Sequence, residues 1–188
     1  MFFQNDNYFI LTGAPGVGKT TLRFELEKAS IKCISEPARI VLAEQRAKQS
    51  EALPEKNKNL FCEMLLQRSM HDHEAYRNYD GPVVFDRGVP DSIAYAGCFN
   101  LNTATYFAEA KKYSYNKTVF LLAPWEEIYT TDDERRMTFD QVLEFHKLIC
   151  GAYGNLGYNL VEVPRGTIQD RANFVKSMCL KNVSRGQK

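Results

Sequence analysis

The sequence Tyr8–Thr21, YFILTGAPGVGKTT, decides the fold of this 188-residue chain. It opens with the apolar run Tyr8–Leu11, passes through three glycines, and ends on a lysine followed by two threonines. A short apolar run bounded by glycine is typical of a buried strand. Glycines allow the next loop to turn its backbone N–H groups inward, toward phosphate oxygens. The stretch therefore predicts a strand, a phosphate-binding loop and a helix, in that order.

The loop itself fits the P-loop pattern G-x(4)-G-K-[ST], with the residues Gly13, Ala14, Pro15, Gly16, Val17, Gly18, Lys19 and Thr20. We expect this loop and Thr21 to bind a nucleotide, with the positive end of the following helix adding to the attraction. The charge of Lys19 is expected to reach the β- and γ-phosphates, and the hydroxyl of Thr20 to bind Mg²⁺. ATP is the predicted nucleotide, and GTP is the alternative.

Length and composition indicate one ordinary globular domain over residues 1–180, with a frayed tail at 181–188. The chain has 24 basic and 23 acidic residues, and this balance counts against a nucleic-acid-binding face. The five cysteines form no C-x-x-C pair, so we expect reduced thiols in a cytoplasmic protein. No signal peptide begins the chain, and no apolar run is long enough to span a membrane. The oligomeric state is left open.

Short apolar runs alternate with longer amphipathic stretches, which predicts an α/β domain with a mainly parallel sheet. The expected strands are Tyr8–Thr12, Ile31–Ser35, Val83–Asp86, Thr118–Ala123 and Tyr158–Val163. Helices are expected from the glycine loop to about Lys28, over about Pro37–Gln49, Asn59–Tyr79 and Phe139–Leu156, twice within Pro90–Lys112, and from Thr167 onward.

Two carboxylates follow strands of this predicted sheet, at the edge where ligands bind in open α/β folds. Asp86 ends VVFD, where it could hold Mg²⁺ through water or accept a proton; a helix cap or a salt bridge with Arg87 is the structural alternative. Glu36, in SEPAR, would face a phosphate acceptor, unless it only favours the start of a helix. Arg39 either shares that cleft or only pairs with Glu36.

The charged run DDERR precedes the helix expected at Phe139 and contains Arg135 and Arg136. Arginines delivered by a polar lid would stabilise the charge that develops during phosphoryl transfer. A solvated charge run is the alternative. Arg165, in the loop after the last strand, is assigned to the adenine side of the nucleotide.

Together, the segments GAPGVGKTT, SEPAR, VVFDRGVPDSIAY, FLLAPWEEIY, DDERRMTF and GYNLVEVP resemble the NadR-like AAA-domain P-loop proteins. Relatives of these proteins include the ribosylnicotinamide kinase domain and, more distantly, deoxynucleoside and thymidylate kinases. The resemblance covers about Tyr8 to Leu180 and implies a three-layer α/β/α sandwich with five parallel strands in the order 2-3-1-4-5. It also implies an acceptor site between Glu36 and Asp86-Arg87, and a lid that carries Arg135 and Arg136.

In nucleoside kinases, a Glu-Pro like Glu36-Pro37 supplies the general base, and an acidic-Arg pair like Asp86-Arg87 assists it. This chain has only Ala123-Pro124-Trp125 where ribosylnicotinamide kinases have a Pro-Asp-x-Pro-Trp stretch, so the nicotinamide substrate does not carry over.

These observations predict a Mg²⁺-dependent phosphotransferase that moves the γ-phosphate of ATP to a hydroxyl of a small molecule. The predicted catalytic residues are Lys19, Glu36, Asp86, Arg87, Arg135 and Arg136, with either Glu36 or Asp86 as the base. Two carboxylates favour transfer, since a hydrolase needs only one and a water. The alternatives are an ATPase or GTPase switch with a protein or lipid partner, which lacks an N-K-x-D motif here, and a non-catalytic nucleotide-binding subunit.

Overall fold

A five-stranded parallel sheet forms the centre of the computed structural model, which describes residues 3–129 and 137–183. Its strands lie in the order β3-β4-β2-β6-β7. Their bounds are Tyr8–Gly13 (β2), Lys32–Ile34 (β3), Val83–Asp86 (β4), Thr118–Leu122 (β6) and Asn159–Glu162 (β7). Counted along the chain, these five strands have the predicted order 2-3-1-4-5, so the predicted fold class and topology are confirmed.

The central strand β2 is buried along its whole length, which is why its sequence is apolar rather than alternating. It pairs with β4 on one side, with Leu11 opposite Asp86, and with β6 on the other, with Gly13 opposite Leu122. This register brings the carboxyl end of β4 beside the start of the glycine loop. The position of Asp86 next to the loop is thus a direct result of parallel pairing.

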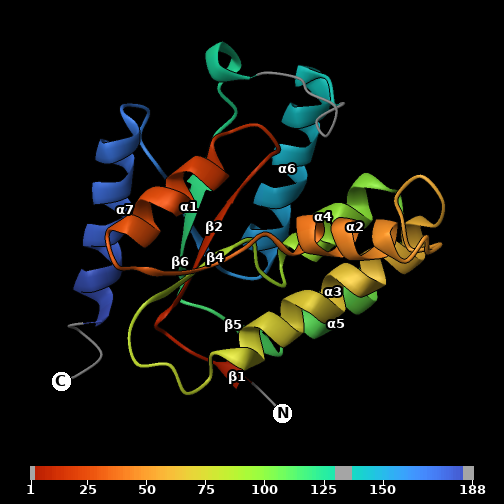
Figure 1. Cartoon of the computed structure of the whole chain (residues 1–188), viewed down its shortest axis with the longest axis horizontal. Coiled ribbons are helices and arrows are strands. Elements are labelled where there is room, and N and C mark those ends of the chain that lie inside the picture. Colours follow the sequence, from red (N-terminus) through yellow and green to blue (C-terminus); the bar gives the residue numbers. More distant parts are fainter. Residues whose placement is uncertain (1–2, 130–136, 184–188) are drawn as a thin grey trace.

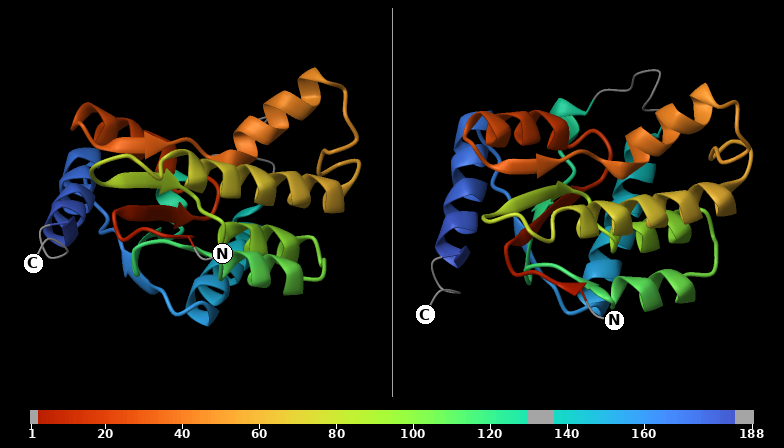
Figure 2. Two further views of the ribbon diagram at one scale, coloured as in Figure 1. Left: turned by 90° about the horizontal axis from the view of Figure 1, so that it is seen from below. Right: turned by 60° about the horizontal axis from the view of Figure 1, so that its bottom comes forward.

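Helices cover both faces of the sheet (Figure 1). Helices α1 and α7 pack together on one face, and α4 and α6 pack together on the other. The turned views show α3 and α5 packed beside α4, and α2 packed against α3 (Figure 2). The helix bounds are Lys19–Lys28 (α1), Pro37–Ala47 (α2), Lys58–Ala75 (α3), Asp91–Cys98 (α4), Ala104–Ala110 (α5), Phe139–Asn155 (α6) and Ile168–Val183 (α7).

Some details differ from the sequence prediction. A second, two-stranded parallel sheet joins β1 (Phe3–Gln4) to β5 (Tyr113–Ser114), and the sequence does not suggest it because two residues carry no periodicity. Helix α3 ends at Ala75 rather than near Tyr79, and α7 continues through Val183, into the segment expected to be a tail. A short 3₁₀ helix, η1, covers Glu126–Ile128 after β6.

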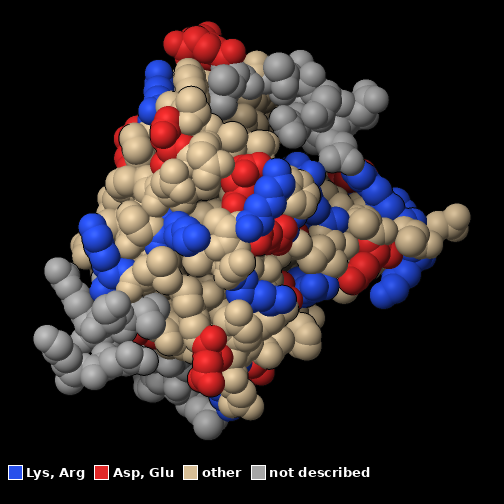
Figure 3. Space-filling view, turned by 60° about the vertical axis from the view of Figure 1, so that its left-hand side comes forward, with Lys and Arg blue, Asp and Glu red and all other residues tan. Residues whose placement is uncertain are grey.

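The surface carries both signs of charge. In the view of Figure 3, Lys and Arg side chains are interspersed with Asp and Glu side chains rather than gathered into a field of one sign. Among residues 3–129 and 137–183, no helix has both the length and the apolar composition to cross a membrane.

Candidate active site

The glycine loop joins the end of β2 to the start of α1. Gly13, Gly16 and Gly18 have φ angles of 144°, 82° and 85°, a region that favours glycine. A Cβ at Gly13 would also lie 2.4 Å from the carbonyl oxygen of Leu122 in β6. Gly18 precedes α1 without any side-chain cap, so the first N–H groups of the helix remain open to an anion. The loop has the geometry required for binding phosphate.

Lys19 is folded back onto this loop. Its Nζ donates to the carbonyl oxygens of Gly13 at 3.0 Å and Ala14 at 3.1 Å, and only 5% of the residue is exposed. Burial lowers the pKa of Lys19 to about 8; the charge of Arg87 adds to this effect, and nearby carboxylates oppose it. The nearby carboxylates thus do not fully compensate for the burial of the ammonium group, and the negative charge of a bound phosphate would stabilise it further.

Asp86 ends β4 with its side chain almost fully buried, at 2% exposed. Its Oδ1 has no hydrogen-bond partner within the described part of the chain. Burial, together with the charge of Glu36, raises the pKa of Asp86 to about 6, although Lys19 and Arg87 act in the opposite direction. An unpartnered buried carboxylate oxygen beside the phosphate-binding loop fits a role toward a cation or a polar ligand.

Arg87 links the ends of two strands. Its Nε donates to Oε1 of Glu36 at 2.7 Å, and its Nη1 donates to Oδ1 of Asp91 at 3.0 Å. The arginine is 2% exposed and has a φ of 72°, an uncommon conformation for a residue other than glycine. The structural alternative for Asp86, a salt bridge with Arg87, does not match these pairs, since Arg87 pairs with Glu36 and Asp91 instead.

Glu36 follows β3 and caps α2 by position, but it makes no side-chain cap hydrogen bond. Burial alone would raise its pKa, but the charges of Arg87 and Lys19 outweigh that effect and lower the pKa to about 2. Arg39 lies 3.3 Å from Oε2 of Glu36 and is 47% exposed, so it pairs with Glu36 at the rim of the site. Glu36 is thus an ionised carboxylate in the turn between β3 and α2.

Aromatic side chains pack around this ion pair. The guanidinium of Arg87 lies 5.5 Å from the ring centre of Tyr95 and 5.7 Å from that of Phe145. The hydroxyl of Tyr95 lies 3.4 Å from Oε1 of Glu36, at the limit of a hydrogen bond. Sequence reasoning missed Asp91, Tyr95 and Phe145, because α4 and α6 have ordinary amphipathic sequences.

The other predicted site residues lie on three further segments. Thr20 and Thr21 follow Lys19 in the first turn of α1, as the P-loop pattern requires. Arg165, in the loop after β7, lies 5.5 Å from the ring centre of Trp125 and 3.4 Å from the carbonyl oxygen of Pro124. Its assignment to the adenine side stays a prediction. The predicted lid residues, Arg135 and Arg136, lie outside the described residues.

A second basic residue near the loop was not predicted. Arg171 in α7 is buried, and its Nη2 lies 3.4 Å from the carbonyl oxygen of Val17. Burial lowers the pKa of Arg171. No motif marks this arginine, since it sits in an unremarkable helical sequence.

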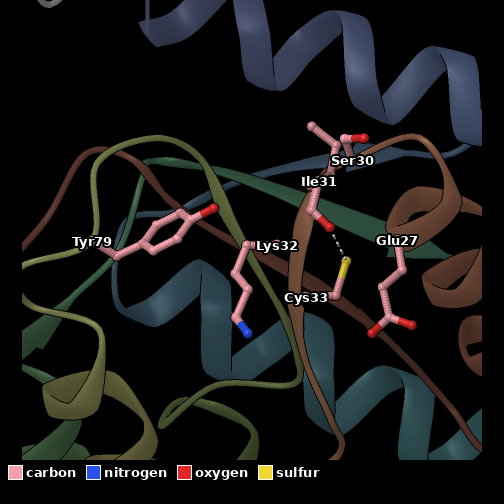
Figure 4. A pocket seen from close by; sticks show the side chains of 6 residues that line it. All are labelled: Glu27, Ser30, Ile31, Lys32, Cys33 and Tyr79. Carbon is pink, nitrogen blue, oxygen red and sulfur yellow. Dashed lines mark hydrogen bonds between the residues drawn. The ribbon is translucent and has the colours of Figure 1, made fainter.

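A shallow pocket of about 360 Å³ lies elsewhere, at the start of β3, and is lined by Glu27, Ser30, Ile31, Lys32, Cys33 and Tyr79 (Figure 4). Glu36 follows the other end of β3, so this pocket is at the opposite edge of the sheet from the phosphate-binding loop. The Cys33 thiol donates to the carbonyl of Ile31, and burial raises the pKa of the thiol to about 12. Such a thiol is unreactive, and we assign the pocket no role in the chemistry.

The fold and the loop define a P-loop nucleotide-binding protein with carboxylates at the loop edge of its sheet. The chain belongs to a family of AAA domains (AAA_28), whose model matches residues 8–171. A comparison with curated protein sequences gave no match.

Several solved structures share the fold. A deoxyadenosine kinase from M. mycoides, with dCMP and dCDP bound, has a TM-score of 0.65 and 16% identity over 93% of this chain and 99% of its own. The NadR protein in complex with NR has a TM-score of 0.70 and 14% identity. This match covers 92% of the present chain and 50% of the NadR chain. Shikimate kinase from Acinetobacter baumannii has a TM-score of 0.55 and 16% identity, with 93% of each chain covered. The fold is therefore that of P-loop kinases.

Proposed function

We propose that this protein is a Mg²⁺-dependent phosphotransferase that moves the γ-phosphate of ATP to a hydroxyl group of a small molecule. The observation that carries the proposal is the pairing of Glu36 with the buried Arg87, next to Asp86 and Lys19. Glu36 follows β3 and Asp86 ends the neighbouring strand β4, so two carboxylates and one buried arginine lie together at the edge where the phosphates would bind. A hydrolase needs only one such carboxylate to orient water.

The proposed roles follow from the charges. Lys19 would exchange its two carbonyl partners for oxygens of the β- and γ-phosphates. Arg87 carries a permanent buried charge, which suits the negative charge that spreads over the transferring phosphoryl group. In-line transfer requires mainly positioning and electrostatic stabilisation, and these rigidly held groups supply both. Arg135 and Arg136 are proposed to add charge from the segment before α6.

Mg²⁺ is the proposed metal. Thr20, at the start of α1, and Asp86, whose Oδ1 has no partner in the described structure, offer the oxygen ligands that this ion prefers. Within the described ranges, no three His, Cys, Asp or Glu side chains cluster as a metal cage. Mg²⁺ in phosphoryl-transfer sites usually keeps several waters and takes only one or two protein ligands besides the phosphates, so the two residues suffice. When bound, the ion neutralises charge on the phosphates.

Glu36 is the base that we favour. Its low pKa leaves it ionised at neutral pH, and its Oε1 accepts from Arg87 and lies 3.4 Å from the hydroxyl of Tyr95. A strong base is not required, because little proton transfer precedes a loose phosphoryl-transfer transition state. Asp86 is then left for the metal.

The nucleotide, the acceptor class and the cellular location complete the proposal. ATP is the proposed donor, with GTP as the alternative, and Arg165 with Trp125 is the proposed contact for the base. The structural relatives phosphorylate small molecules, as their names as deoxyadenosine and shikimate kinases indicate, and a small-molecule acceptor is proposed here without naming it. The five cysteines are free, which suits the reducing cytoplasm.

The test uses Glu36→Gln and Asp86→Asn in an assay with MgATP and pooled nucleosides, sugars and vitamins. Glu36→Gln is expected to lose about 10²-fold or more in acceptor-dependent ATP turnover, as general bases do. Asp86→Asn is expected to lose a similar factor, because it weakens the proposed Mg²⁺ site. The matched controls, Glu63→Gln and Asp80→Asn, change exposed carboxylates far from the loop and should behave as the wild type. If Glu36→Gln and Asp86→Asn leave turnover intact and no acceptor is phosphorylated, the proposal fails.

A further inference from the structure

We infer that Asp91, the first residue of α4, is the positioning residue that holds Arg87 and ties it to the phosphate-binding loop. This inference rests on the proposed phosphotransfer and concerns how its site is assembled. Asp91 is 2% exposed, follows Arg87 by four residues, and has no role assigned to it by the sequence.

Both carboxylate oxygens of Asp91 are fully used. Oδ1 accepts from the Thr12 hydroxyl at 2.6 Å and from Nη1 of Arg87 at 3.0 Å. Oδ2 accepts from the Tyr153 hydroxyl at 2.6 Å and from the backbone N–H of Gly88 at 2.9 Å. These four donors come from β2, from the turn after β4 and from α6. A buried carboxylate with this many donors is fixed in orientation.

The contact with Thr12 gives Asp91 a link to the nucleotide side. Thr12 precedes Gly13 in β2, and the carbonyl of Gly13 is one of the two acceptors of Lys19. A single side chain therefore connects the strand that leads into the loop with the arginine on the acceptor side.

Arg87 requires a second carboxylate partner because Glu36, the first one, also takes part in the proposed reaction. In the proposed mechanism, Glu36 accepts a hydrogen bond from the acceptor hydroxyl, and this competes with its hold on Nε of Arg87. Asp91 bonds a different nitrogen, Nη1, and its other hydrogen bonds in the described part of the chain go to Thr12, Gly88 and Tyr153. The arginine can then keep its place and its left-handed backbone while Glu36 changes partner.

A purely structural role for Asp91 makes a different prediction, and Tyr153 separates the two. Tyr153→Phe removes one neutral donor from Oδ2 but leaves the contact between Asp91 and Arg87 intact. Asp91→Asn keeps the shape of the side chain but removes the charge that faces Arg87. If Asp91 only stabilises the fold, the two variants should lose activity in proportion to their loss of stability.

The experiment compares Asp91→Asn and Tyr153→Phe in the full-length protein. With MgATP and the acceptor found in the screen, Asp91→Asn is expected to lower kcat by about 10- to 100-fold while the KM for MgATP changes by less than about threefold. Tyr153→Phe should lower the melting temperature but change kcat by less than about threefold. Equal kcat losses for equal losses of melting temperature would overturn the inference. In an Arg87→Lys background, Asp91→Asn should lower kcat little further, because the arginine that Asp91 holds is already absent.

A second measurement does not depend on the acceptor. The Nε–Hε NMR signal of Arg87, assigned by its loss in Arg87→Lys, should stay sharp in Tyr153→Phe and broaden in Asp91→Asn. An unchanged signal in folded Asp91→Asn would overturn the inference even if phosphotransfer is real. If the wild type phosphorylates no acceptor, the proposed function fails, and the NMR signal still decides whether Asp91 holds Arg87.

Discussion

Asp86 is a single residue whose burial is expected to lower the stability of the fold at neutral pH. Its carboxylate is 2% exposed, and Oδ1 has no hydrogen-bond partner within residues 3–129 and 137–183. Burial, together with the charge of Glu36, raises its pKa from an ordinary 3.8 to about 6. The folded state then binds a proton more tightly than the unfolded state does. Stability therefore falls as the pH rises from about 4 to about 6, and it stays lowered at neutral pH.

This cost predicts the effect of Asp86→Asn on stability. At pH 7 the free energy of unfolding should rise by about 1–3 kcal/mol, because the amide carries no buried charge. The gain should shrink as the pH is lowered toward 4, where the wild-type carboxyl is protonated. Thermal melts of the nucleotide-free protein between pH 4 and pH 7 measure this, with Asp80→Asn as the exposed control. A variant that is less stable than the wild type at pH 7 would contradict the account of Asp86.

Gly13 is the second residue whose neighbours set a clear expectation. Gly13→Ala would place a Cβ at a φ of 144° and 2.4 Å from the carbonyl of Leu122, so the loop or β6 must move. We expect a loss of about 2–4 kcal/mol in the free energy of unfolding, measured by urea denaturation.

Gly154→Ala is the matched control for that substitution. Gly154 lies near the end of α6, and an added Cβ there meets no atom within 4 Å. Alanine is favoured over glycine in a helix, so this variant should gain about 0.5–1 kcal/mol. Equal effects at the two glycines would contradict the description of the loop.

At the scale of elements, the site is built where the turns after two parallel strands meet two helices. Strands β3 and β4 bring Glu36 and Asp86 to one edge, while α4 and α6 bring Tyr95 and Phe145 to the face of Arg87. Helix α6 also donates the Tyr153 hydroxyl to Asp91. Phe145 lies in the first half of α6, so the start of this helix helps to position the ring that faces Arg87.

That start is fixed by a capping box. The Thr138 hydroxyl accepts from the N–H of Gln141 at 3.3 Å, and the Gln141 side chain accepts from the N–H of Thr138 at 2.8 Å. Thr138→Ala should cost about 0.5–2 kcal/mol of stability, measured by thermal or urea unfolding. Thr105→Ala, at an exposed position inside α5, is the control and should have no such cost. An equal effect in both variants would show that the cap does not stabilise α6.

At the scale of the whole molecule, the sequence predicts which residues parallel pairing brings to the carboxyl edge of the sheet. Strand ends gather at one edge, so the P-loop pattern and the residues after two apolar runs were enough to place Lys19, Glu36 and Asp86 there. The order of the five core strands was also predicted correctly, through the family resemblance.

The remaining features depend on contacts between residues far apart in the chain. Arg87 and Glu36 are separated by 51 residues, and Asp91 and Tyr153 by 62. An aspartate that opens a helix resembles an ordinary cap in the sequence, and a tyrosine in an amphipathic helix resembles a core residue. The pattern of α4 therefore gave no sign that Asp91 holds four donors. The two short strands β1 and β5 were missed because they have no periodicity to detect.

The central claim is that the γ-phosphate passes to an organic hydroxyl, and the most direct measurement follows that phosphate. The wild-type protein is incubated with Mg²⁺, γ-labelled ATP and the pool of nucleosides, sugars and vitamins, and the labelled products are separated. The account predicts that most of the released label appears in one organic phosphate ester, and that this product disappears in Glu36→Gln. Label found only in inorganic phosphate, at the same rate with and without the pool, would contradict it.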